Sequence, residues 1–143
     1  QPTSVKADEF VRQIGALNPD VLVVVAFGHF LPKPILDIPP LGAVNIHPSL
    51  LPAYRGPSPI QWAMVNMETQ TGVTSIFMDE HMDAGDIIVS RTEEISPKDT
   101  AATLHDRLAL VGADVLVETL GQIRQGPLSL CPRTIRRPLL PLY

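Results

Sequence analysis

The sequence lacks the features that mark secreted, membrane-spanning and nucleic-acid-binding proteins. It has one cysteine, Cys131, so no internal disulfide can form, and a lone thiol is typical of a reduced cytosolic protein. Its longest purely apolar run, residues 21–27, is far too short to span a bilayer. The net charge of −4 provides no overall basic surface for phosphate backbones. We therefore expect a globular, cytoplasmic protein without a membrane partner.

Residues for metal and thiol chemistry are also sparse. The four histidines are scattered, and no pair has the close spacing of a metal-binding motif; they are His29, His47, His81 and His105. No helix start or clear cationic partner marks Cys131, so its thiol has no sign of activation as a nucleophile. The sequence therefore predicts neither a metal site nor a catalytic cysteine.

What the sequence does contain is a series of helical and strand-like segments within the length of one domain. The run at 21–27 is β-branched and has no polar alternation, which is typical of a strand buried on both faces of a parallel sheet. Further strands are predicted at 43–47, 72–78 and 87–92, helices at 8–17, 60–66 and 100–124, and a proline-rich loop with at most one helical turn at 32–40. The pattern predicts an α/β fold.

Asn45 and His47 are the first candidates for chemistry. They lie two residues apart on a predicted strand, so their side chains share one face of the sheet. They also stand at the carboxyl end of that strand, where open α/β sheets bind ligands. Spacing alone favours a hydrogen-bonded histidine beside a structural asparagine over a reacting pair.

Asp83 is the third candidate, in the turn between two predicted strands. A turn aspartate commonly bonds its own backbone, which is one interpretation. The other is a carboxylate that orients His47 and stabilises its imidazolium form. An amide donor, a histidine and a fixed carboxylate suit acyl transfer, although the sequence does not show that the three meet.

Longer motifs around these residues resemble a known family. The run Asn45-Ile46-His47-Pro48-Ser49-Leu50-Leu51-Pro52, followed by Tyr54-Arg55-Gly56, resembles the signature loop of the 10-formyltetrahydrofolate-dependent formyltransferases. Pro59-Ile60-Gln61-Trp62-Ala63 is most similar to the branch that acts on methionyl-tRNA, and Thr71-Gly72-Val73-Thr74 and Met82-Asp83-Ala84-Gly85-Asp86 continue the match. The resemblance runs from about residue 8 to residue 126.

The resemblance implies a role for each matching position. Asn45 would steady the formyl oxygen, His47 would shuttle protons, and Asp83, rather than Asp79 or Asp86, would pair with that histidine. The pterin ring of the donor, 10-formyltetrahydrofolate, would be enclosed by Phe27, Gly28, His29, Phe30, Leu31, Met82 and Ala84. The loop that supports the asparagine and the histidine would be Pro48, Ser49, Leu50, Leu51 and Pro52.

The sequence also departs from the family pattern. It does not contain the βαβ unit that opens the family's sheet, so we expect a partial doubly wound, Rossmann-like sheet with an uncovered apolar edge at 21–27. On this interpretation residues 1–127 are the C-terminal half of a catalytic domain and 128–143 a proline-rich tail, without the family's tRNA-binding domain. We expect a fragment or a homo-oligomer that covers the edge. Met67 stands where the family usually has glycine.

Three functions remain open. The first is transfer of a formyl group from 10-formyltetrahydrofolate to an amine, with initiator methionyl-tRNA as the first-choice acceptor. The second keeps the same chemistry but uses the amine of a sugar nucleotide, or water in a formyltetrahydrofolate hydrolase. The third, of another class, is an inactive folate-binding or structural paralogue.

Overall fold

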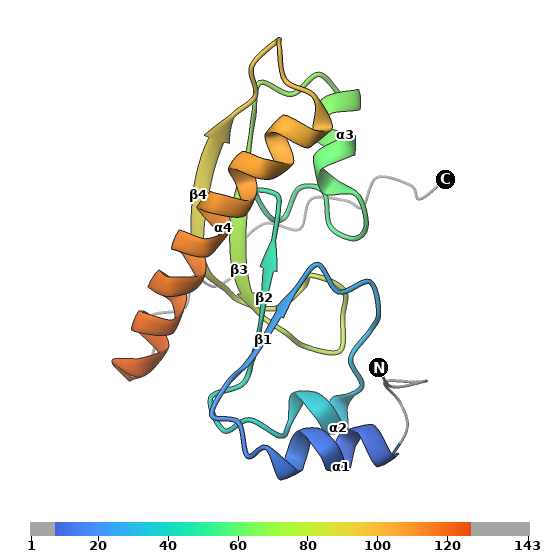
Figure 1. The fold of residues 1–143 in the computed structure, drawn as a ribbon, viewed down its shortest axis with the longest axis vertical. Coiled ribbons are helices and arrows are strands. Elements are labelled where there is room, and N and C mark those ends of the chain that lie inside the picture. The colour runs from blue at the N-terminus through green and yellow to red at the C-terminus, as the bar shows by residue number, and fades with distance from the viewer. Residues whose placement is uncertain (1–7, 127–143) are drawn as a thin grey trace.

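The computed structural model describes residues 8–126 and shows one sheet with helices packed around it (Figure 1). The elements follow one another as α1 (Asp8–Ala16), β1 (Leu22–Val25), α2 (Lys33–Leu36), β2 (Ala43–His47), α3 (Pro59–Val65), β3 (Gln70–Phe77), β4 (Ile87–Glu94) and α4 (Ala101–Arg124). This order confirms the α/β fold and the helices and strands that the sequence predicts. The tail at 128–143, with Cys131, lies outside the described residues.

The sheet is mixed rather than parallel. Its strand order is β1-β2-β3-β4, with β1 parallel to β2 and the other two pairs antiparallel. The segment 78–86 that joins β3 to β4 is too short for the crossover of a dozen or more residues that parallel neighbours require. The parallel pairing predicted for the strand at 21–27 is confirmed for β1 and β2, whereas β3 is antiparallel to both of its neighbours.

β1 lies at an edge of the described sheet. Of its residues only Val24 is buried, whereas Val25 is 56% exposed and Phe27, just beyond the strand, is 44% exposed. This exposure shows that the prediction of a strand buried on both faces is wrong, and β1 also pairs on one side only among the described strands. The uncovered apolar edge expected at this strand is present in the described part of the chain.

The core lies between the sheet and α4, which packs across β2, β3 and β4 (Figure 1). The apolar positions of α4 recur every three or four residues, so they form one stripe along the helix. In this stripe Leu104, Leu108, Val115 and Ile123 are buried, and Val111 is partly buried against the same cluster. The sheet contributes Val44, Ile46, Val73 and Val89. This core fixes β2 and β3, the strands next to the candidate site.

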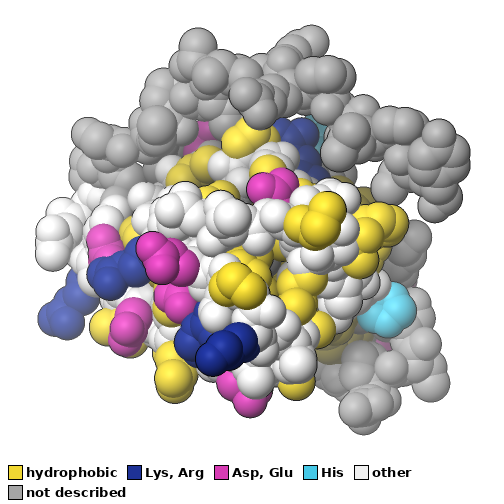
Figure 2. All heavy atoms as spheres, turned by 90° about the horizontal axis from the view of Figure 1, so that it is seen from above, with side chains coloured by type: hydrophobic (Ala, Val, Ile, Leu, Met, Phe, Trp, Pro, Cys, Tyr) yellow, Lys and Arg dark blue, Asp and Glu magenta, His cyan; other side chains and the backbone are white. Residues whose placement is uncertain are grey.

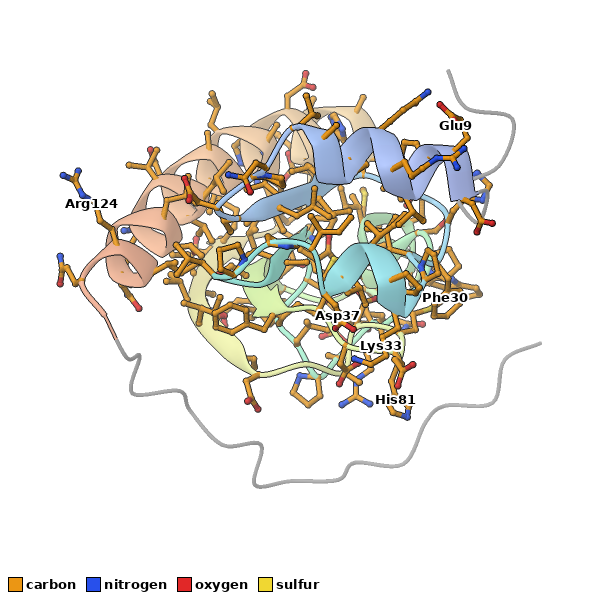
Figure 3. The ribbon with its side chains drawn as sticks, turned by 90° about the horizontal axis from the view of Figure 1, so that it is seen from below. Glu9, Phe30, Lys33, Asp37, His81 and Arg124 are labelled. Atoms are coloured by element: carbon orange, nitrogen blue, oxygen red, sulfur yellow. The ribbon has the colours of Figure 1, made fainter. Side chains whose placement is uncertain are left out.

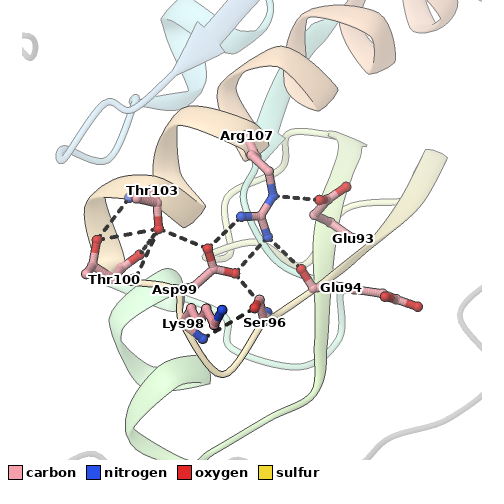
Figure 4. Close-up of polar contacts among 8 residues, drawn as sticks. All are labelled: Glu93, Glu94, Ser96, Lys98, Asp99, Thr100, Thr103 and Arg107. Atoms are coloured by element: carbon pink, nitrogen blue, oxygen red, sulfur yellow. Dashed lines mark hydrogen bonds and ion pairs between the residues drawn. The ribbon is translucent and has the colours of Figure 1, made fainter.

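The start of α4 is tied to the end of β4 by a polar network around Arg107 (Figure 4). Thr100 caps α4: its hydroxyl accepts the backbone N–H of Thr103, while the Thr103 hydroxyl accepts the backbone N–H of Thr100. Arg107 donates to both oxygens of Asp99, at 2.6 and 2.9 Å, and to Glu93 at 2.9 Å. The guanidinium of Arg107 holds the pKa of Asp99 well below its usual range.

The surface is divided by character. Figure 2 shows hydrophobic side chains gathered toward the right, on the side of α3, with charged side chains toward the left. Trp62 and Val65 of α3 are 54% and 67% exposed, and Met67 in the following turn is 86% exposed. No helix within residues 8–126 combines the length and apolar character needed to cross a membrane.

Candidate active site

Two side chains of β2 and one from a distant turn meet at the carboxyl end of that strand. Asn45 Nδ2 donates to Asp83 Oδ1 at 3.1 Å, and His47 Nδ1 lies 3.6 Å from Asp83 Oδ2. The His47 and Asp83 side chains are only 6% and 13% exposed. The shared face predicted for Asn45 and His47 is therefore confirmed, and Asp83 lies against both. Asp83 lies in a turn, as predicted, and its carboxylate contacts the side chains of β2.

The His47 ring is held on both sides. Its Nε2 lies 2.8 Å from the backbone oxygen of Tyr54, while Nδ1 faces Asp83. A backbone carbonyl can only accept a hydrogen bond, so Nε2 carries the hydrogen in this contact. The carboxylate then lies beside the other ring nitrogen, where it complements a positive charge on the ring.

The loop after β2 is fastened to β3 through Thr74, a fully buried side chain. The Thr74 hydroxyl donates to the Ser49 carbonyl at 2.7 Å and accepts the Leu51 N–H at 3.2 Å. The Ser49 hydroxyl in turn donates to the Ala53 carbonyl at 2.7 Å. The residues predicted to support the site, from Pro48 to the cis-linked Pro52, thus form a loop with internal and cross-strand hydrogen bonds.

A glycine allows this loop to approach β3. A Cβ at Gly72 would lie 2.1 Å from the Arg91 carbonyl oxygen and 2.6 Å from the Leu50 side chain. Only a residue without a side chain fits between β4 and the loop at this point. Gly72 therefore couples the sheet to the loop that follows His47.

The Asp83 turn depends on a second close approach. A Cβ at Gly85 would lie 1.6 Å from the backbone oxygen of Phe77, so the turn can fold over the end of β3 only with glycine there. Asp83 itself has a left-handed backbone conformation, with φ 47°. Its Oδ2 accepts the Gly56 N–H at 2.8 Å. The turn is thereby fixed both to β3 and to the loop after β2.

A cavity of about 440 Å³ opens beside these three side chains, and Asn45, His47 and Asp83 all line it. Every residue predicted to enclose a pterin lines it too, namely Phe27, Gly28, His29, Phe30, Leu31, Met82 and Ala84. The rings of Phe27 and His29 meet edge to face, with centroids 5.6 Å apart. Its size and its largely apolar lining with a few polar groups are typical of a small-molecule site.

A smaller cavity of about 330 Å³ adjoins the first and shares Met78, Asp79 and His81 with it. Lys33 and Asp37 of α2 line this second cavity and form an ion pair at 2.8 Å. Figure 3 shows their side chains and that of His81 on the same side of the molecule. The two cavities therefore lie side by side along the turn at 78–86.

The chemistry of the site is that of an amide, an imidazole and a carboxylate around an apolar cavity. Among residues 8–126, no group of three or more histidine, cysteine or acidic side chains is placed to hold a metal ion. Asn45 uses one hydrogen of its amide on Asp83, so the second can point to a ligand in the cavity. A donor of this kind beside a histidine and its carboxylate can stabilise an oxyanion and move a proton.

Some residues that build the site were not assigned a role by the sequence. Tyr54 and Gly56 belong to the motif that carries the family resemblance, yet they act through a backbone carbonyl and a backbone N–H. Every residue type provides a carbonyl, so the side-chain sequence gives no signal for such a contact. Thr74 was detectable only as a polar residue inside an otherwise apolar strand, a position that is buried and needs hydrogen-bond partners.

The chain is similar to known proteins over most of its length. The formyl transferase family model matches residues 1–120. The methionyl-tRNA formyltransferase of Geobacter metallireducens is 51% identical over 129 residues, which cover 90% of this chain and 42% of that protein. The chain thus spans about two fifths of the length of the curated relatives it matches.

Solved structures show the same fold. Phosphoribosylglycinamide formyltransferase from Bacillus halodurans superimposes with a TM-score of 0.73 at 34% identity, over 78% of this chain and 58% of that one. HypX from Aquifex aeolicus, solved in complex with tetrahydrofolic acid, has the same fold with a TM-score of 0.79 at 23% identity, over 88% of this chain and 22% of that one. On the family match and this sequence identity, the chain belongs to the formyl transferase family.

Proposed function

We propose that this chain carries the centre that transfers a formyl group from 10-formyltetrahydrofolate to an amine. The observation that carries the proposal is the convergence of Asn45, His47 and Asp83 on one wall of the 440 Å³ cavity. The amide is the oxyanion donor, the imidazole moves the proton, and the carboxylate holds both. No covalent enzyme intermediate and no metal are needed for this reaction.

The first-choice acceptor is initiator methionyl-tRNA. Its support is the 51% identity to a methionyl-tRNA formyltransferase and the matching segment at 59–63. The amine of a sugar nucleotide is the second choice, because the segment 65–72 also resembles sugar-nucleotide formyltransferases. Since the chain spans 42% of that relative, other parts of a complete enzyme would contribute to acceptor binding.

In the proposed reaction the amine nitrogen attacks the formyl carbon and forms a tetrahedral oxyanion. The second N–H of Asn45 donates to that oxygen, while its first stays on Asp83. A positioned donor of this kind is worth on the order of 3 kcal/mol of transition-state stabilisation. The bond from the formyl carbon to the folate N10 then breaks, and the acceptor leaves as a formamide.

A proton must pass from the attacking amine to the leaving folate nitrogen. His47 is the group for this transfer, because it lines the cavity and its Nδ1 faces Asp83 at 3.6 Å. The negative charge of Asp83 stabilises the imidazolium that forms when the ring holds the proton. General acid–base help of this kind contributes roughly 10²–10⁴-fold to the rate.

The proposed fold of the complete enzyme is a doubly wound sheet in which β1 is not an edge. An apolar strand with one open side is an association hazard, so we propose that another strand covers it, from a longer polypeptide or from a second copy of this chain. Light scattering on the 143-residue chain distinguishes these cases, because a monomer at micromolar concentration contradicts cover by a second copy. We place the protein in the cytoplasm.

Two measurements on this chain test the function. Calorimetry with 10-formyltetrahydrofolate tests the donor site, and the expected result is binding that Phe30→Asp weakens. A transfer assay then offers initiator methionyl-tRNA, an amino-sugar nucleotide or water alone. Formylated methionyl-tRNA supports the first-choice acceptor, and a formylated sugar nucleotide supports the second. Release of formate without an amine supports the hydrolase. Binding with neither transfer nor hydrolysis contradicts the enzyme and leaves a folate-binding paralogue.

A further inference from the structure

The backbone of Tyr54 is the unexpected partner of His47. Tyr54 has a left-handed conformation, with φ 56°, which side-chain-bearing residues adopt only when the surroundings require it. This conformation turns its carbonyl oxygen toward the ring, 2.8 Å from His47 Nε2. Two residues further on, the Gly56 N–H donates to Asp83 at 2.8 Å. One short stretch of backbone therefore contacts both members of the histidine–carboxylate pair.

The phenol of Tyr54 is fixed at a separate place. Its hydroxyl donates to Glu68 Oε1 at 2.6 Å and accepts from Asn66 Nδ2 at 3.0 Å. Partial burial, with the Glu68 hydrogen bond as the second cause, raises the pKa of Tyr54, so the phenol stays protonated and able to donate. The hydroxyl therefore fixes the ring through one hydrogen bond that it donates and one that it accepts.

The residues that hold the phenol belong to the turn after α3. The Asn66 N–H donates to the Trp62 carbonyl at 3.0 Å, and the Glu68 N–H donates to the Ala63 carbonyl at 3.0 Å. Both side chains are therefore mounted on a hydrogen-bonded helix end rather than on a free loop. A fixed support of this kind can hold the Tyr54 backbone in its strained conformation.

We propose that Tyr54 is a positioning residue for His47. Its phenol, held between Glu68 and Asn66, fixes the carbonyl that takes the Nε2 hydrogen, so that Nδ1 is the ring nitrogen presented to Asp83. The catalytic consequence rests on the proposed function, in which His47 moves the proton. The arrangement of the ring is independent of that function. Nε2 stays engaged throughout, and Nδ1 is the nitrogen that gains and loses the proton.

The test compares three variants with a matched control. Tyr54→Phe removes the hydroxyl and keeps the ring, Glu68→Ala removes the acceptor, and Glu68→Gln keeps an acceptor oxygen. The control is Glu118→Ala, which removes the acceptor of the hydrogen bond from Arg91 of β4 to Glu118 of α4. That bond is 2.6 Å long, the same length as the bond from Tyr54 to Glu68. Nitrogen-15 NMR of the histidine rings, assigned with His→Gln variants, reports which ring nitrogen of His47 carries the hydrogen.

The native chain is expected to show His47 as the Nε2–H tautomer, or with both nitrogens protonated, and a slowly exchanging Nε2–H. Tyr54→Phe and Glu68→Ala are expected to lose that slow exchange and to mix the tautomers, whereas Glu68→Gln and Glu118→Ala keep the native spectrum. If the native ring carries its hydrogen on Nδ1 alone, or if Glu68→Ala matches Glu118→Ala, the proposal is overturned.

Kinetics add a second readout. Displacing a catalytic group slightly lowers turnover more than binding, so Tyr54→Phe and Glu68→Ala are expected to lose roughly ten- to a hundredfold in kcat with little change in KM. Glu68→Gln should recover most of the loss. If the native chain shows no turnover, the proposed function is contradicted, and the NMR spectra still test whether Tyr54 positions His47. Native turnover that Tyr54→Phe leaves unchanged overturns the positioning.

Discussion

Replacing Asp83 by asparagine changes the site by one charge and almost no volume. The carboxylate accepts the Asn45 amide through Oδ1 and the Gly56 N–H through Oδ2, and it faces His47 Nδ1. An amide has one acceptor oxygen, so an N–H group must replace one of the two carboxylate oxygens. In one orientation the Gly56 N–H then faces another donor. In the other, the Asn45 amide must rotate to present its oxygen, and this rotation withdraws the N–H proposed to donate to the oxyanion.

The size of the effect follows from these contacts. Losing one hydrogen bond to a charged group, in a site this buried, costs about 2 kcal/mol of unfolding free energy. In a domain of this size that lowers Tm by roughly 8 °C. The catalytic loss is larger, because the proton carrier loses its stabilising charge, and we expect a fall of roughly 10²–10⁴-fold in kcat.

The assay pairs thermal unfolding with formyl transfer and uses Asp86→Asn as its control. Asp86 lies in the same turn, and its side chain is exposed. The control is expected to keep both the Tm and the turnover of the native chain. If Asp83→Asn behaves like Asp86→Asn in both measurements, the carboxylate of Asp83 neither stabilises the site nor supports the proton transfer.

Three further changes probe the fold around the site. Gly85→Ala is expected to prevent native folding or to displace the turn, because its Cβ would meet a backbone carbonyl at 1.6 Å. Its control is Gly121→Ala, where a Cβ meets open space and the unfolding free energy should rise by about 0.5–1 kcal/mol. Circular dichroism and Tm measurements compare the two variants. Met67→Gly is expected to raise unfolding free energy by about 0.5 kcal/mol in urea titrations, since at φ 52° the relief of left-handed strain outweighs the entropy of glycine; a loss would contradict this. Asp99→Asn is expected to lower stability at neutral pH. Because the pKa of Asp99 is depressed by Arg107, the deficit stays constant above about pH 4 and shrinks in acid, and a pH-independent deficit would exclude that cause.

Sequence patterns were sufficient for local structure and for one pair of site residues. Asn45 and His47 share a face because strand side chains alternate, and the structure confirms it. Asp83 is 38 residues from Asn45, so spacing could not bring it to the pair. The family resemblance predicted their meeting, and the contact depends on Gly85, whose missing side chain lets the turn approach β3.

The same patterns failed where neighbours decide the outcome. The strand at β1 has the composition of a buried strand, yet Val25 is largely exposed, because burial depends on which elements cover the faces of the sheet. The hydrogen bonds of Tyr54 and Gly56 to the pair use backbone groups, which side-chain identity does not report. Met67 was recognised as unusual from the resemblance, and its left-handed backbone shows why glycine suits that turn.

The most direct test of the central claim is single-turnover loss of 10-formyltetrahydrofolate on the 143-residue chain, with an amine acceptor present. The native chain should convert bound donor to tetrahydrofolate and a formylated amine. Asn45→Ala should slow the step by about 10²–10³-fold, and His47→Ala should abolish it, with donor binding kept in both. Equal rates in the native chain and His47→Ala would show that these residues are not a formyl-transfer centre.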